Sequence, residues 1–151
     1  MPKIIKDSAN PEVIFRILNG TTGLPVTDYV YEDESSASPI LLELWYRRPG
    51  GEKVAITPAE LASPGAAWTE GGICHISDGY FVVHPPAASV ASESPDIGNP
   101  VVLFGGSLTD CVIVGTSVML VDDLVDANVA AVNGITVTGS GTSVDPWGPA
   151  S

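Results

Sequence analysis

The chain has 151 residues, of which 44% are hydrophobic and 16% charged, with 16 glycines and 13 prolines. This length fits one domain that buries its own core, and the composition favours short extended segments over long amphipathic helices. All six basic residues lie within residues 1–53, beside eight acids, whereas residues 54–151 carry ten acids and no base. Because nucleic acids and anionic membranes are bound through Lys and Arg, this balance excludes both as expected partners.

Neither a secretion signal nor a membrane span is expected. Asp7, Pro11 and Glu12 interrupt any apolar run near the N-terminus. The longest apolar stretch, "CVIVGTSVMLV" at 111–121, is far shorter than the roughly 20 residues of a membrane helix. It predicts a buried strand.

Alternating apolar residues predict the first strands. The segment "EVIFRILNG" (12–20) predicts a strand closed by an Asn-Gly turn. Residues 19–39 are rich in turn formers and acids, which indicates a long surface connection. The segments 40–47 and 52–56 then predict a hairpin joined through "PGG".

Two adjacent arginines, Arg47 and Arg48, stand at the end of that predicted hairpin. We interpret them as an exposed hairpin end, with Glu43 and Glu52 as cross-strand ion-pair partners. A clamp for a phosphate or carboxylate group is the alternative.

The segment "TPAELASPG" (57–65) carries a helix-start pattern. Thr57 stands at the N-cap position, Pro58 at the first helical position and Glu60 at the third. The pattern predicts about one helical turn, ended by the Pro-Gly pair.

The segment "GICHISDGYFVVHPP" (72–86) predicts a hairpin with a two-residue Asp78-Gly79 turn that pairs Ser77 with Tyr80. Counting from that turn, alternation predicts an apolar face and a more polar one. The apolar face would hold Cys74, Ile76, Phe81 and Val83, and the polar face Ile73, His75, Ser77, Tyr80, Val82 and His84.

The histidines and cysteines do not form a recognised catalytic or metal-binding pattern. His75 and His84 are interpreted as exposed strand residues, because a zinc or acid–base site needs further ligands or a nucleophile. Cys74 and Cys111 are expected to be free buried thiols, with a cross-sheet disulfide of immunoglobulin type as the alternative. No catalytic residue, cofactor or metal is predicted, and the protein is not expected to be an enzyme.

Two further strands are predicted at 99–106 and 108–121, separated by "GGS". With the earlier strands they make about seven, at the spacing of a sandwich. The expected fold is therefore all-β, an immunoglobulin-like β-sandwich over residues 1–121 with a C-terminal extension.

Residues 122–151 differ in character, and we expect a linker followed by a Gly/Thr-rich tail that serves in oligomerisation or docking. The apolar content of the tail is too sparse for a core, yet a neighbouring subunit could bury it. The predicted interface residues are Ile135, Val137, Val144 and Trp147.

The order of motifs resembles a group of small immunoglobulin-like virion proteins of tailed bacteriophages and prophages. The resemblance covers most of residues 10–148 and is carried by "WYRRPGGEKVAI", "LASPGAAWTEGGI", "DGYFVVHPPAA" and the ending "GSGTSVDPWGPA". Proteins of this group are labelled tail-fibre, baseplate or decoration proteins. Their matching motifs are structural, so no catalytic residue is implied.

The resemblance implies a non-enzymatic structural protein of the virion, of attachment, decoration or fibre type. It would assemble on the tail or on the capsid and neck, with other virion proteins as partners and a homo-oligomer, by preference a trimer, as its own state. It would be made and assembled in the host bacterial cytoplasm.

A carbohydrate-binding β-sandwich for adhesion to the host surface is the alternative function. Trp45, Trp68 and Tyr80 would offer the stacking platforms for sugar rings.

Overall fold

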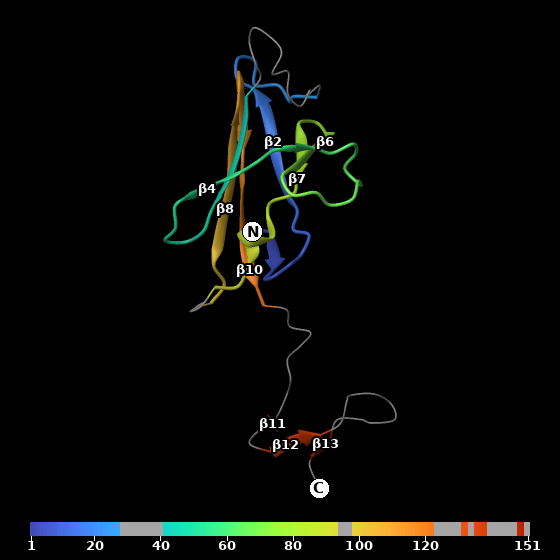
Figure 1. Ribbon diagram of the computed structural model, residues 1–151, viewed down its shortest axis with the longest axis vertical. Coiled ribbons are helices and arrows are strands. Elements are labelled where there is room, and N and C mark those ends of the chain that lie inside the picture. Colours follow the sequence, from blue (N-terminus) through green and yellow to red (C-terminus); the bar gives the residue numbers. More distant parts are fainter. Residues whose placement is uncertain (28–40, 94–97, 123–130, 133–134, 139–147, 150–151) are drawn as a thin grey trace.

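The computed structural model describes residues 1–27, 41–93, 98–122, 131–132, 135–138 and 148–149. Ten strands form one mixed sheet and three short strands form a second sheet (Figure 1). No α-helix occurs in these residues, which contain only a 3₁₀ turn, η1 (Ala87–Val90). The expectation of a β-rich fold is confirmed.

The strands of the large sheet are β1 (Lys3–Ile5), β2 (Val13–Asn19), β3 (Leu42–Arg47), β4 (Lys53–Ile56), β5 (Ala59–Glu60), β6 (Gly72–Ser77), β7 (Tyr80–Val83), β8 (Val101–Leu108), β9 (Cys111–Val114) and β10 (Thr116–Val121). Their order is β1-β10-β8-β9-β2-β7-β6-β5, with β3 pairing to β8 and β4 to β3. The sheet does not close on itself. Only β1 with β10 and β5 with β6 are parallel pairs.

Strand β2 joins the two halves of this sheet. Residues Val13–Arg16 pair with β7, and residues Arg16–Asn19 pair with β9 on the opposite edge. The side chains of Val13, Phe15 and Ile17 are buried, as the predicted alternation requires.

One apolar core unites both halves of the sheet. Phe15, Phe81 and Leu120 are fully buried in it, although their strands are not neighbours along the chain. The core residues are Val13, Phe15, Ile17, Leu44, Tyr46, Ile56, Ile73, Phe81, Val83, Val90, Val102, Phe104, Leu108, Val118 and Leu120.

The β6–β7 hairpin has the predicted turn, and Phe81 and Val83 are buried and Tyr80 exposed as predicted, but the faces predicted for β6 are wrong and Val82 is buried too. A β-bulge between His75 and Ser77 inserts Ile76 as an extra residue, so that Ile73 pairs with Val83. Ile73 is therefore buried and Ile76 is 43% exposed, the reverse of the prediction. A bulge shifts parity by one, which moves every residue beyond it to the other face.

A second irregularity divides the predicted strand 108–121 into β9 and β10. The chain takes five steps from Cys111 to Thr116 while its partner β8 takes four. As a result Val114 before this point is half exposed, whereas Val118 after it is buried. Alternation along one unbroken strand would place both valines on the same face, so this irregularity reverses the burial expected for the strand 108–121.

The predicted break at Gly105-Gly106-Ser107 is also wrong, because β8 runs through it to Leu108. Gly105 lies opposite Trp45, and a Cβ on Gly105 would collide with the indole ring. A glycine inside a strand often marks such a close approach. The turn lies instead at Thr109-Asp110, where Asp110 has a φ of 56°.

The helical turn predicted at 57–65 is not formed. Ala59–Glu60 is instead the strand β5, which pairs in parallel with β6. The Ala59 amide donates to the Gly71 carbonyl at 2.9 Å, and the Leu61 amide donates to Ile73 at 3.2 Å. These tertiary hydrogen bonds outweigh the local capping pattern.

The second sheet lies after residue 130 and consists of β11 (Ala131–Val132), β12 (Ile135–Thr138) and β13 (Gly148–Pro149), with β12 in the centre. No strand pairing joins it to the large sheet within the described residues. The division into domains at residues 121 and 122 remains a prediction.

Phe15→Ala should lower the free energy of unfolding by about 3–5 kcal/mol, because it leaves a cavity in the shared core. Val54→Ala, at a 43% exposed position of β4, should cost less than about 1 kcal/mol. Urea denaturation followed by circular dichroism measures both. Equal costs for the two variants would contradict this core.

Candidate functional site

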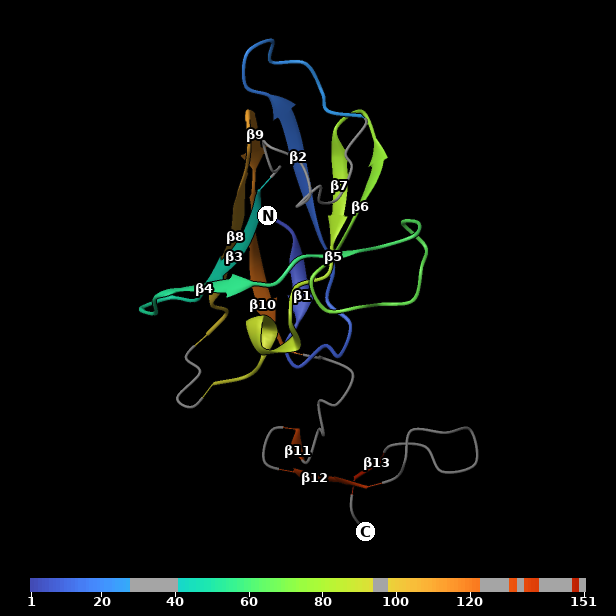
Figure 2. The same cartoon turned by 45° about the horizontal axis from the view of Figure 1, so that its top comes forward.

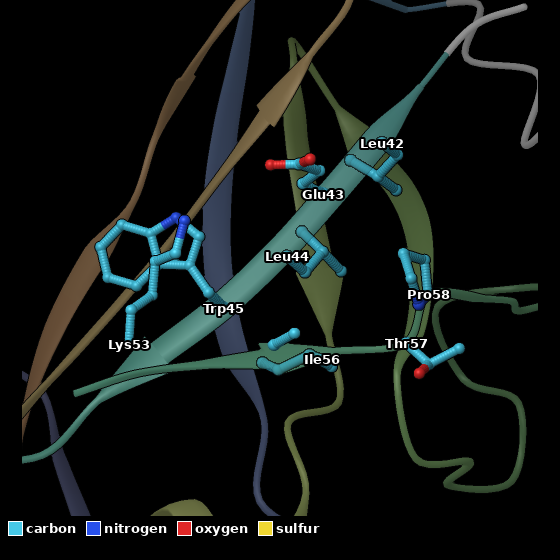
Figure 3. Close-up of a pocket in the computed structure, with 9 residues that line it drawn as sticks. Leu42, Glu43, Leu44, Trp45, Lys53, Ile56, Thr57 and Pro58 are labelled. Carbon is cyan, nitrogen blue, oxygen red and sulfur yellow. The ribbon is translucent and has the colours of Figure 1, made fainter. Parts of the chain in front are cut away.

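A groove of about 390 Å³ lies along β3 and β4, beside Trp45 (Figure 3). The polar side chains at its rim are Glu43, Lys53 and Thr57. The complete lining is Leu42, Glu43, Leu44, Trp45, Lys53, Ala55, Ile56, Thr57 and Pro58.

Strand alternation places Trp45 at this groove. Its neighbours Leu44 and Tyr46 point into the core, so Trp45 lies on the opposite face. The cross-strand partners of Trp45 are Ala55 and Gly105, two small residues that leave room for the indole. The indole can therefore lie flat over these two small residues.

Charged groups flank the indole. The Lys53 ammonium lies 6.0 Å from the Trp45 ring centroid, at a cation–π distance. The Ser107 hydroxyl donates to the Glu43 carboxylate at 3.4 Å. The groove thus combines an aromatic ring with one cation and one carboxylate, and its lining holds no nucleophile paired with a base.

The arginine pair differs from its prediction. Arg47 is exposed and donates through Nε to the Gly51 carbonyl at 2.9 Å, closing the turn. Arg48 is buried, where Nη1 donates to the Ser89 carbonyl at 3.0 Å and Nε lies 2.7 Å from Glu93 Oε1. The prediction that both arginines are exposed and pair with Glu43 and Glu52 is wrong for Arg48, because this side chain fixes the segment around η1.

His84 is fully buried, and the prediction that it is an exposed strand residue is wrong. Its Nδ1 accepts from the Thr69 amide at 3.2 Å, so Nε2 bears the proton and donates to Glu12 Oε1 at 3.2 Å. The Trp68 ring stacks on the imidazole, with centroids 6.0 Å apart, and its Nε1 donates to the Pro11 carbonyl at 3.0 Å. This cluster fastens the loop before β6 to the start of β2.

His75 lies apart from that cluster and packs against Phe81, with ring centroids 5.1 Å apart. Among the described residues no three His, Cys, Asp or Glu side chains are close enough to hold a metal ion. The two histidines are therefore separate packing residues in this part of the chain.

Cys74 and Cys111 are free thiols, as expected, but both are only partly buried. Burial raises the pKa of each thiol, and the nearby carboxylates of Glu60 and Asp110 raise it further. The alternative of a disulfide is not formed.

The three aromatic residues of the carbohydrate hypothesis do not stack on one another. Trp45 lies at the groove, Trp68 is stacked on His84, and Tyr80 on β7 contacts Arg16. The three rings therefore lie at three different contacts and do not form a single platform.

Two of the four predicted interface residues, Ile135 and Val137, belong to strand β12, in which Val137 pairs with Pro149 of β13. Val144 and Trp147 lie outside the described residues. The interface remains a prediction.

Sequence reasoning missed the Glu12–His84–Trp68 cluster and the Arg48–Ser89 contact. Glu12 and His84 are 72 residues apart, and Arg48 and Ser89 are 41 apart. No local spacing signals such contacts, because they depend on which strands pair.

No protein-family model, curated protein or solved structure matches this chain. Among the described residues, the structure has no helix of the length and hydrophobicity needed to cross a membrane.

His84→Ala should destabilise the protein by roughly 2–4 kcal/mol, because it opens a cavity and leaves the Thr69 amide without its acceptor. It should also change the near-ultraviolet circular dichroism of Trp68. His75→Ala, at a partly exposed position, is the matched control and should cost about 1 kcal/mol. A silent His84→Ala variant would show that the cluster does not hold the loop.

Alkylation of the two cysteines should be slow at pH 8 and should accelerate at a higher pH than for a free cysteine. A raised pKa means that less reactive thiolate is present at a given pH, and the rate follows the thiolate fraction. Iodoacetamide labelling of native protein between pH 7 and 10, followed by mass spectrometry, measures this. Full labelling within seconds at pH 7 would contradict the structure.

Proposed function

We propose that this protein is a non-enzymatic structural component of a tailed-bacteriophage virion, which its C-terminal segment holds in an assembly. The observation that carries this proposal is the division of the strands into two sheets with no pairing between them in the described residues. A large β-sheet with its own core is followed by a minimal sheet that needs a partner.

The large sheet supports the immunoglobulin-like sandwich in this proposal. Strands β1, β10, β8, β3 and β4 form one ladder, strands β2, β7, β6 and β5 form another, and β9 pairs with both through β8 and β2. The chain crosses between the ladders after β1, β2, β4 and β7, and such crossings are compatible with the Greek-key connections of a sandwich. The core draws side chains from both ladders, as two facing sheets would.

The small sheet supports an assembly role. Its strands have two, four and two residues, whereas strands in stable sheets have about five. So short a sheet is marginal in isolation, and its open edges can accept strands from another chain. The proposed interface residues Ile135, Val137, Val144 and Trp147 belong to this segment.

The proposed setting is a symmetric homo-oligomer, by preference a trimer, on the tail, neck or capsid. Other virion proteins are its partners, and assembly takes place in the host bacterial cytoplasm. The formal net charge of −12 agrees with protein partners and disfavours binding to nucleic acid.

Carbohydrate binding for adhesion is the second candidate, and the groove beside Trp45 favours it. An indole face flanked by Lys53 and Glu43 suits a sugar ring, which stacks through its C–H face and donates hydrogen bonds at its edges. This function would coexist with assembly, because the groove lies on β3 and β4 and not in the C-terminal segment.

Deleting residues 122–151 should convert an oligomer into a monomer that still melts cooperatively, because the core lies in residues 13–120. Analytical ultracentrifugation measures the mass, and circular dichroism verifies folding. In cells that produce the particle, the full chain should co-sediment with virions and the shortened chain should not.

Trp45→Ala is the control variant for that experiment. It should remain oligomeric and enter particles, although it would lose any glycan binding. A shortened chain that assembles normally would refute the assembly role of the segment.

A further inference from the structure

One outward face of the large sheet combines exposed apolar side chains with a single cation. We call it the Arg16 face, and it consists of Ile14, Arg16, Tyr80, Val112 and Val114. The four uncharged members are between 42% and 52% exposed. They come from β2, β7 and β9, which lie side by side in Figure 2.

Strand register brings these residues together. Arg16 is the cross-strand partner of both Tyr80 and Val114, so it stands at the centre. Ile14 lies two residues before Arg16 on the same side of β2, and Val112 lies two residues before Val114 on the same side of β9. The opposite face of β2 packs into the core through Val13, Phe15 and Ile17, so the side chains of the Arg16 face are not part of the core.

Arg16 has an incomplete set of partners. Its guanidinium carbon lies 5.2 Å from the Tyr80 ring centroid, a cation–π contact. Its Nε is buried and makes no hydrogen bond within the described residues. A buried donor without an acceptor is costly, so this face favours a ligand that brings a carboxylate.

The same face of a second copy does not meet this requirement. A two-fold axis through the Arg16 face would set Arg16 near its own copy, and no member of the face is acidic. The occupant must present one carboxylate among apolar groups. A contact between two different surfaces can close a ring of copies, such as a trimer, whereas a two-fold pair uses the same surface on both copies.

The sequence contains one such segment, residues 144–147, "VDPW". Asp145 is the only charged side chain between residues 127 and 151, and Val144 and Trp147 flank it. We propose that the Arg16 face of one copy binds residues 144–147 of a neighbouring copy. The Asp145 carboxylate pairs with Arg16, while Val144 and Trp147 cover the exposed valines, Ile14 and Tyr80.

This inference rests on the proposed assembly function and adds the surface on which the segment docks. Burial of a tryptophan and pairing of an arginine are the contacts that typically dominate interface energies. Pro146 restricts the backbone of the segment and so lowers the entropy lost on docking.

Charge reversal in the full-length protein tests the contact. Arg16→Glu and Asp145→Arg should each raise the dissociation constant of the oligomer by about tenfold or more, whereas the double variant should recover most of the wild-type affinity. Trp147→Ala should weaken assembly by a similar factor. The matched controls are Arg47→Glu and Glu52→Lys, exposed reversals outside the Arg16 face that should leave the dissociation constant unchanged.

Mixing the two single variants shows whether the segment that docks comes from the same copy or from a neighbouring copy. If docking occurs between copies, an equimolar mixture of Arg16→Glu and Asp145→Arg should associate more tightly than either variant alone. In the mixture the altered face of one variant can bind the altered segment of the other, and the unaltered face can bind the unaltered segment. Circular dichroism verifies that Arg16→Glu is folded. If it is not, Asp145→Arg and Trp147→Ala decide the question, because they leave the large sheet untouched.

Three results would overturn this docking surface. The first is a double variant or a mixture that recovers no affinity. The second is an Arg16→Glu chain that self-associates normally but fails to enter particles, which would assign the face to another virion protein. The third is normal assembly of Asp145→Arg and Trp147→Ala when deletion of residues 122–151 abolishes assembly, which would leave the proposed function intact and refute the docking surface alone.

Discussion

The shared pairing of strand β2 is the constraint on which the rest of the structure depends. Its first half hydrogen-bonds to β7 and its second half to β9, so one strand of seven residues connects both parts of the large sheet. The inward side chains, Phe15 among them, fill the common core, and the outward side chains form the Arg16 face. Packing and the proposed docking surface are therefore two sides of the same strand.

The sequence predicts strands well where alternation and turn chemistry act locally. The β3–β4 and β6–β7 hairpins follow from "PGG" and Asp78-Gly79. Faces fail beyond Ile76 and Gly115, because one extra residue reverses parity and no local signal marks it. The capping pattern at Thr57 fails for a different reason, namely that β6 offers the segment a parallel partner.

Polar residues that suggested chemistry or a solvated surface serve to hold the fold together. Both His84 and Arg48 are buried. His84 forms a hydrogen bond with Glu12, 72 residues away, and Arg48 donates to the Ser89 carbonyl, 41 residues away. Alternation alone assigns such residues to solvent, because it cannot foresee a covering loop such as the one that carries Trp68. At the Trp45 groove the sequence did identify the outward aromatic, whereas its charged neighbour Lys53 depends on the β3–β4 register.

In the proposed assembly, the large β-sheet with its own core is followed by a C-terminal sheet that a neighbouring copy completes. Hydrogen exchange of the β12 amides, Ile135–Thr138, measured across a range of protein concentrations, tests this claim most directly. Protection of β12 should rise with concentration as copies associate, while protection of β2 stays constant and high. Protection of β12 that is equally strong in dilute monomer, or absent even in concentrated protein, would contradict the account.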